Sequence, residues 1–145
     1  MLSLSCETTL HVRDHCLCLH VQRAARTLAR RFDEALRPLG LTNGQFSLMI
    51  SLNRPEPPTM SSVASLLGMD RTTLTAALKP LERRGVIRAV ADAKDRRTRL
   101  MELTIDGQSL LERALPIWER THADLDRLLA NGKSGDFRAV LRALA

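Results

Sequence analysis

The chain has 145 residues, the size of one ordinary domain, and its hydrophobic fraction of 44% is enough for a packed core. Lys and Arg number 22 against 16 Asp and Glu, so the formal net charge of +6 favours a polyanionic partner over a small acidic substrate. With three Phe, one Trp and no Tyr, the composition disfavours reading of RNA or single strands by aromatic stacking. Duplex DNA fits this composition better.

Neither a membrane segment nor an export signal is expected. No apolar run approaches the ~20 residues of a membrane span, and the N-terminal stretch MLSLSCETTLHVRD lacks the basic start and long apolar segment of a secretory signal. Cys6, Cys16 and Cys18 are odd in number and lie close together, unlike the cysteines of an extracellular disulfide framework. We therefore expect a cytoplasmic protein with reduced thiols and no membrane partner.

The N-terminal third predicts two helices. Apolar residues recur at helical spacing over about residues 14–36, and the sequence RPLG then ends this long amphipathic helix. Thr42, with Gln45 three positions later, forms a capping-box signature that predicts a second helix over about 43–52. The turn-rich sequence NRPEPPT stops it.

The central segment predicts a helix-turn-helix. Ser61 or Ser62 can cap a short helix that reaches Gly68. Asp70 then stands in an N-cap position, and a second helix continues until Gly85, a suitable C-terminal stop. Two short helices joined by a tight turn that contains glycine form this motif.

After Gly85 the sequence period changes. The segments VIRAVA and RLMELT suit two strands, and the charged segment DAKDRRT between them suits the tip of a hairpin. Helical spacing resumes over about 106–128, and a last helix is expected over about 136–144. The predicted fold is mainly α, with six helices and one small β-hairpin.

The positive charge is concentrated on the second helix of the motif and on the hairpin. Arg71, Thr72, Thr73 and Thr75 stand at the N-terminus of that helix, the end that a recognition helix inserts into the major groove. Arg can bind guanine there with two hydrogen bonds, and Thr can offer a hydroxyl or a methyl group. Any single basic residue can instead be an ordinary solvated side chain. The combination of motif, charged hairpin and basic composition favours DNA binding.

The sequence LGMDRTTLTAALKPLERRGVI, followed by DAKDRRTRLMELTIDGQSLL, resembles the core of the MarR family of winged helix-turn-helix regulators, and helix order and length match over nearly the whole chain. The resemblance implies that the second helix faces the major groove. It implies that Arg97 reaches the minor groove from the tip of the wing, with Asp95 orienting its basic neighbours. The candidate DNA-binding residues are Arg71, Thr72, Thr73, Thr75, Lys79, Arg83, Asp95, Arg97 and Arg99.

The resemblance also implies a homodimer in which the first helix and the last two helices of each copy intertwine. We expect one domain over 1–145, with a DNA-binding lobe over about 40–105 and dimerisation helices over about 10–39 and 106–145. A two-fold dimer places two recognition helices about 34 Å apart, which predicts a pseudo-palindromic operator. Repression is the commoner outcome in the family, and activation remains an alternative.

The family suggests a small-molecule signal. Many members hold a small aromatic or anionic ligand between the dimerisation helices and the DNA-binding lobe, so we expect a repressor that a ligand releases. The candidate lining residues are His20, Arg23, Phe46, Met49, Trp118 and His122. The alternative is that these are core or interface residues, since apolar residues at helical spacing usually pack. No cofactor is expected.

A thiol-based redox sensor is a second interpretation. Cys18 stands where organic-hydroperoxide sensors of the family carry a peroxide-reactive cysteine, and Cys16 is close by. Those sensors activate the thiolate with tyrosines, which this chain lacks, and His15 or His20 would have to replace them. A buried, inert cysteine is the competing interpretation.

Metal binding, catalysis and binding of proteins alone are the remaining classes of function. His11 and His15, like Cys16 and His20, are four residues apart, a spacing that zinc ligands use, but no CxxC pair exists and we predict no metal site. No phosphate loop or nucleophile elbow is present, so we do not expect an enzyme. A helical protein that binds only other proteins is the remaining alternative, and a salt-sensitive gel shift would separate it from a DNA-binding protein.

Overall fold

The computed structural model describes residues 4–129 and 134–145. In chain order the elements are α1 (Cys6–His15), α2 (Leu17–Leu36), the 3-10 helix η1 (Arg37–Leu39), α3 (Asn43–Leu52), α4 (Met60–Leu67), α5 (Arg71–Arg83), β1 (Ile87–Ala91), β2 (Arg99–Leu103), α6 (Ile105–Leu128) and α7 (Ser134–Leu144). The prediction of a mainly helical fold with one small β-hairpin is confirmed. Within the two described ranges, no helix is both long and apolar enough to cross a bilayer.

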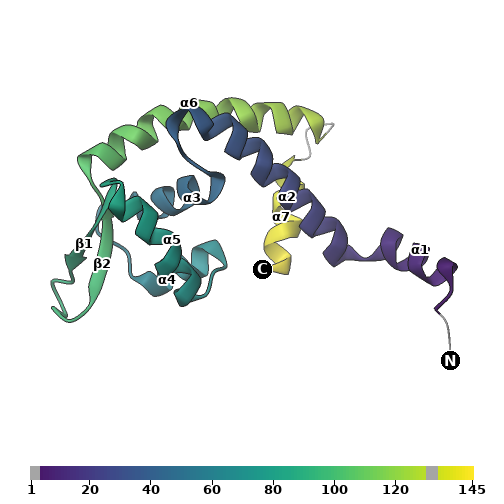
Figure 1. Cartoon of the computed structure of the whole chain (residues 1–145), viewed down its shortest axis with the longest axis horizontal. Coiled ribbons are helices and arrows are strands. Elements are labelled where there is room, and N and C mark those ends of the chain that lie inside the picture. Colours follow the sequence, from purple (N-terminus) through teal and green to yellow (C-terminus); the bar gives the residue numbers. More distant parts are fainter. Residues whose placement is uncertain (1–3, 130–133) are drawn as a thin grey trace.

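The elements form two parts that differ in shape (Figure 1). Helices α3, α4 and α5 and the β1–β2 hairpin make a lobe, which lies below α6 and the adjoining end of α2. Beyond this lobe α2 continues outward, α1 projects further in the same direction, and α7 lies below α6, where it overlaps α2 in this view. Because α2 and α6 also pack against each other, the lobe is attached to a pair of long helices.

The core lies where the lobe meets α2 and α6. Its buried side chains include Leu36, Leu41, Phe46, Met49, Val63, Leu74, Leu78, Leu81, Val86, Ile87, Leu110 and Leu111. In α5, Leu74, Leu78 and Leu81 follow each other at intervals of four and three, so they share one helical face. Burial of each leucine contributes roughly 2 kcal/mol, which fixes this face and leaves the opposite face of α5 free.

The predicted helix over about 14–36 is present as α2, and the short helix α1 precedes it, so the described residues form seven α-helices where six were predicted. Helix α1 ends at His15, and Cys16 has an extended backbone with φ −70° and ψ 105°. The Sγ atom of Cys16 accepts a hydrogen bond from the N–H of Leu19 at 3.5 Å and so caps α2. Ser5 caps α1 in the same way through Thr8 N–H at 3.2 Å. Apolar spacing alone did not indicate either cap, which is why α1 and the start of α2 at Leu17 were not predicted.

Side-chain caps define the starts of the helices in the lobe. Thr42 and Gln45 form the expected capping box, because Thr42 Oγ1 accepts from Gln45 N–H at 3.2 Å and Gln45 Oε1 accepts from Thr42 N–H at 3.1 Å. Helix α4 is capped by Thr59, whose Oγ1 accepts from Ser62 N–H at 3.1 Å. The predicted caps Ser61 and Ser62 were therefore wrong by two or three residues, because the chain becomes helical directly after Thr59.

The hairpin forms as the alternation of its residues predicted. Strands β1 and β2 are antiparallel, with Ile87 opposite Leu103 and Ala91 opposite Arg99. Helix α6 begins directly after β2, and its N-cap Thr104 donates its N–H to Val86 O at 3.1 Å. The start of α6 is thereby joined to the backbone at the start of the wing.

Candidate nucleic-acid interface

The helix-turn-helix consists of α4, a glycine turn and α5. Gly68 ends α4 with φ +64°, in the left-handed region that glycine adopts without strain. Asp70 then caps α5, because its Oδ1 accepts from Thr73 N–H at 2.8 Å and its Oδ2 from the Thr73 hydroxyl at 2.6 Å. These hydrogen bonds to the charged carboxylate lower the pKa of Asp70 below its ordinary value. The turn and the cap together fix the direction in which α5 starts.

The free face of α5 carries the residues that were predicted to read the major groove. Arg71, Thr72, Thr73, Thr75 and Lys79 are all exposed. The hydroxyls of Thr73 and Thr75 donate to Asp70 Oδ2 and to Arg71 O, so their lone pairs and methyl groups remain available to a partner. Within the described residues the Arg71 and Lys79 side chains have no hydrogen bond or ion pair.

The tip of the hairpin is ordered by two aspartates through the backbone. Asp92 Oδ1 accepts from Lys94 N–H at 2.9 Å, and Asp95 Oδ1 accepts from Arg97 N–H at 3.0 Å. Asp95 Oδ2 also accepts from the Thr98 hydroxyl at 3.1 Å. Asp95 thus holds the main chain around Arg97 and leaves its guanidinium group exposed, without a partner among the described residues.

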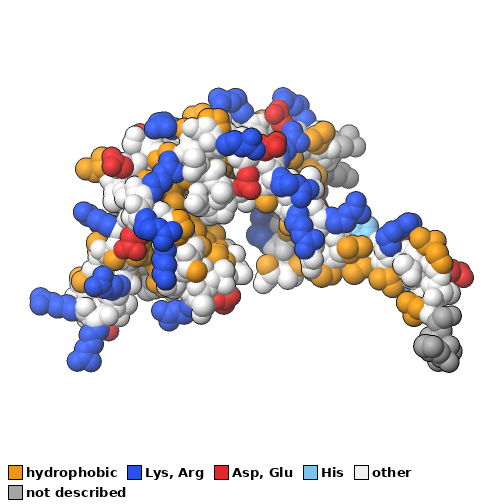
Figure 2. Space-filling view, in the orientation of Figure 1, with side chains coloured by type: hydrophobic (Ala, Val, Ile, Leu, Met, Phe, Trp, Pro, Cys, Tyr) orange, Lys and Arg blue, Asp and Glu red, His pale blue; other side chains and the backbone are white. Residues whose placement is uncertain are grey.

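Two arginines of the basic segment are engaged within the protein. Arg88 pairs with Glu102 across the hairpin at 2.7 Å, and Arg84 binds backbone carbonyls outside α5. The other basic side chains of this segment point outward, and Figure 2 shows several of them projecting from the end of the hairpin. Arg83 and Arg99 are among the exposed residues, together with Lys94 and Arg96, which the predicted contact set omitted. Their place next to Arg97 at the charged tip was a usable signal.

The comparisons with known proteins agree with this arrangement. The family model described as "MarR family" matches residues 41–98. The organic hydroperoxide resistance transcriptional regulator of Bacillus subtilis is 31% identical over 101 residues, which cover 70% of this chain and 69% of that protein. The chain belongs to the MarR family.

Solved structures of transcriptional regulators have the same fold as this MarR-family chain. MosR of M. tuberculosis, solved in complex with DNA, is 38% identical with a TM-score of 0.80, covering 90% of this chain and 93% of MosR. The repressor CouR, solved on a 23-mer DNA duplex, is 26% identical with a TM-score of 0.82 and 99% coverage of both chains. CouR has also been solved with p-coumaroyl-CoA; that chain is 25% identical, has a TM-score of 0.78, and 88% of this chain and 90% of CouR are covered.

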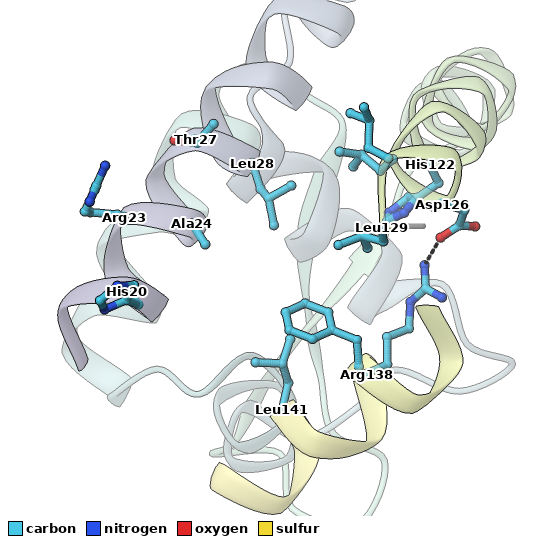
Figure 3. Close-up of a pocket in the computed structure, with 13 residues that line it drawn as sticks. His20, Arg23, Ala24, Thr27, Leu28, His122, Asp126, Leu129, Arg138 and Leu141 are labelled. Carbon is cyan, nitrogen blue, oxygen red and sulfur yellow. Dashed lines mark hydrogen bonds and ion pairs between the residues drawn. The ribbon is translucent and has the colours of Figure 1, made fainter. Parts of the chain in front are cut away.

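Away from the lobe, this MarR-family chain contains a cavity of about 650 Å³ between α2, α6 and α7 (Figure 3). Its walls are mainly apolar and include Leu28, Leu125, Leu129, Phe137 and Leu141. The volume is within the roughly 300–1,000 Å³ that is usual for small-molecule sites.

The six residues predicted for a ligand site are not all in this cavity. His20, Arg23 and His122 line it, whereas Phe46 and Met49 are buried in the core and do not. Trp118 lies between the two groups, with ring centroids 6.2 Å from Phe46 and 4.2 Å from His122. Phe46 and Met49 therefore have the packing role that the alternative interpretation assigned to them.

His122 is a half-buried polar residue of the cavity wall. Its ring lies between Phe32 and Trp118, and its buried Nδ1 has no hydrogen-bond partner among the described residues. Burial lowers the pKa of His122 below its ordinary value, and the nearby charge of Arg138 lowers it further. Arg138 itself is paired with Asp126 at 3.0 Å, an ion pair drawn in Figure 3.

The cysteines and the N-terminal histidines lie around the α1–α2 break. Cys18 is exposed in the single chain, contrary to the interpretation of a buried cysteine, and its Sγ is 3.1 Å from Gln22 Nε2. His20 Nδ1 donates to the backbone carbonyl of Cys16, so the partner of the His20 ring is a main-chain oxygen and not the Cys16 thiol. Within residues 4–129 and 134–145, no three His, Cys, Asp or Glu side chains converge as metal ligands.

Proposed function

We propose that this MarR-family chain is a homodimeric repressor that reads a pseudo-palindromic operator through α5 and the wing. The observation that carries the proposal is the free guanidinium of Arg71 at the start of α5 together with that of Arg97 at the wing tip. Both arginines are held by ordered backbone and have no acidic partner among the described residues. DNA complexes of MosR and CouR, similar in fold over most of the chain, support this assignment. The relatives are regulators, so we assign regulation and no catalysis.

The residues of the interface make different kinds of contact with DNA. The N-terminal half of α5 meets base edges, where Arg71 discriminates guanine and the threonine methyl and hydroxyl groups favour particular neighbours. Arg97 enters the adjacent minor groove, whose negative potential attracts it. Lys79, Arg83 and Arg99 bind phosphates and supply affinity without sequence preference.

A second copy covers the apolar surface that the single chain exposes. Leu17 on α2, and Val140 and Leu144 on α7, have 60–62% of their surface exposed, and α1 has no buried residue. The orange side chains along the lower face of α1 and α2 in Figure 2 belong to this surface. Leaving so much contiguous apolar area in water is unfavourable, and a two-fold partner removes it. Residues of about 10–39 and 106–145 therefore form the dimerisation part.

A small aromatic or anionic molecule regulates this dimer from the cavity between α2, α6 and α7. The cavity is open in the single chain, and a second copy against α2 and α7 encloses it. His122 and Arg23 lie on the wall of the cavity, where they are polar residues of α6 and α2 near such a molecule. The CouR complex with p-coumaroyl-CoA, an anionic thioester with an aromatic acyl group, supports control by a bound ligand in a similar fold.

A thiol switch at Cys18 is the second candidate function. Its exposure and the similarity to the hydroperoxide resistance regulator favour it. Treatment with an organic hydroperoxide should then release the protein from DNA, and the Cys18→Ser variant should remain bound. Equal release of both proteins would exclude Cys18 as the sensor.

The decisive experiment measures binding to duplexes recovered by selection from a randomised pool. Fluorescence anisotropy over a series of salt concentrations gives affinity and salt slope for wild type, Arg97→Ala, Arg71→Ala and the control Arg113→Ala. Arg113 is an exposed α6 residue, so the control matches the change in charge. We expect Arg97→Ala to lose about 1 kcal/mol or more and to reduce the slope by ~1, and Arg71→Ala to relax one base per half-site. If the wild type binds no duplex at low ionic strength, the proposed function is wrong.

A further inference from the structure

The C-terminal end of α5 is joined to a distant part of the chain by one side chain. Arg84, the C-cap of α5, donates from Nη1 to Gly40 O and from Nη2 to Leu39 O, both at 2.7 Å. The two carbonyls are consecutive, so the planar guanidinium binds them as a fork. Its charge is therefore directed to the protein backbone, unlike that of Arg71 or Arg97.

The two carbonyls belong to the 3-10 helix η1 and its C-cap, directly after the long helix α2. Helix η1 follows α2 without interruption, and Gly40 ends it with φ +64°. The carbonyls at such a helix C-terminus lack helical partners and carry partial negative charge, which favours a cation. Leu36 and Leu41 on either side are buried, with 0% and 2% exposure, so the backbone that Arg84 binds is fixed in the core.

The residues that follow Arg84 are bound to the other long helix. The Thr104 hydroxyl, at the N-cap of α6, donates to Gly85 O at 2.7 Å, and Thr104 N–H donates to Val86 O at 3.1 Å. Three consecutive residues after α5 are thus hydrogen-bonded to the end of α2 on one side and to the start of α6 on the other. The two hydrogen bonds to the end of α2 both come from the Arg84 side chain.

We propose that Arg84 is a positioning residue that sets the angle between the reading helix α5 and the long helices of the dimer. This inference rests on the proposed function, because the angle matters only if two α5 helices must meet two half-sites at once. Without Arg84, the end of α5 keeps its bonds to α6 and loses those to α2. The reading helix can then rotate about the junction, and the dimer fits one half-site spacing less selectively.

The test compares Arg84→Met with Arg113→Met, which removes the same charge from an exposed position on α6. Each protein is titrated with the selected operator, with the same half-sites separated by one or two base pairs more or fewer, and with unrelated duplex. We expect Arg84→Met to bind the native spacing about tenfold more weakly, the equivalent of losing one charge-assisted hydrogen bond, and to discriminate less among spacings. Its salt slope and its affinity for unrelated duplex should equal those of Arg113→Met. Arg84→Lys, which can reach a carbonyl but cannot bind as a fork, should fall between wild type and Arg84→Met.

Two results of the DNA titrations would overturn the inference. A salt slope that is lower by about one with unchanged spacing preference would make Arg84 a phosphate contact. Binding that equals the control in every respect would leave it no role in recognition. Hydrogen exchange in the free protein gives a reading without DNA: the amides of Gly85 and Val86 should lose protection in Arg84→Met only. Wild type that binds no duplex would contradict the proposed function, and unchanged protection would contradict the tether itself.

Discussion

Replacing Gly107 with alanine tests how closely α6 packs on the wing. A Cβ at this position would overlap the carbonyl oxygen of Val86, and it would also lie 3.0 Å from the Val86 carbonyl carbon and 3.3 Å from Leu103 Cδ2. The obstacle is backbone, so it cannot rotate away as a side chain would. The same carbonyl oxygen accepts the Thr104 N–H at 3.1 Å, so moving it also weakens the N-cap region of α6.

The expected cost follows from these two effects. Overpacking against fixed atoms costs roughly 1–3 kcal/mol, and a lost backbone hydrogen bond adds about 1 kcal/mol. Gly107→Ala should therefore lower the free energy of unfolding by about 2–4 kcal/mol. For a domain whose total stability is on the order of 5–15 kcal/mol, that is a large fraction.

Urea unfolding followed by far-UV circular dichroism measures this change, at one fixed protein concentration because dimerisation adds to apparent stability. Gly44→Ala is the matched control, since Gly44 is also in the first turn of a helix and its Cβ would meet only Thr42 Oγ1, at 4.0 Å. There alanine should raise stability by about 0.5–1 kcal/mol, because glycine has the lower helix propensity. If Gly107→Ala is as stable as Gly44→Ala, the close packing of α6 on the wing is refuted.

Two further predictions concern the wing and the cavity. Asp95→Ala removes the acceptor of Arg97 N–H and of the Thr98 hydroxyl; operator affinity should fall several-fold, by ~1 kcal/mol, with no loss of salt slope in anisotropy titrations. Burial and Arg138 lower the pKa of His122 below its ordinary 6.5, so its contribution to stability is complete above pH 6.5 and is lost as the pH falls toward the folded-state pKa. Fluorescence of Trp118, the only tryptophan, should be quenched with a midpoint below 6.5, and a pH-independent signal, or an unchanged titration in His122→Phe, would contradict this.

The helix-turn-helix was predictable because its boundaries depend on local chemistry. Asp70 has a carboxylate at the position where the first free N–H groups of α5 need an acceptor, and Gly85 adopts φ +76° after the last turn. Both signals lie within a few residues of the boundary that they set. The hairpin was equally local, since its alternating residues pair across one short turn.

The break at Cys16 and the cavity were not predictable in the same way. A thiol is a weak acceptor that sequence rules do not count as a cap, so Cys16 did not mark the start of α2. Membership of the cavity depends on how α7 is placed relative to α2, which no spacing in the sequence specifies. The family's cleft between the dimerisation helices and the lobe suggests Phe46 and Met49 as lining residues, but the fold buries both in the core.

The positions of the cavity and of the Arg84 junction suggest a route by which ligand binding affects the DNA-binding surface. The cavity is bounded by one part of α2, around Ala24, and by the far part of α6, around Leu125, whereas the junction lies at the opposite end of each helix. A ligand that spreads α2 from α6 at the cavity would also change the two points to which the end of α5 is bound, provided that α6 transmits the movement past Pro116. The ligand shifts the dimer only by the difference in its affinity for the two arrangements, and DNA must oppose ligand binding by the same factor. Loosening the junction at Arg84 should therefore weaken this mutual effect even where ligand and operator each still bind.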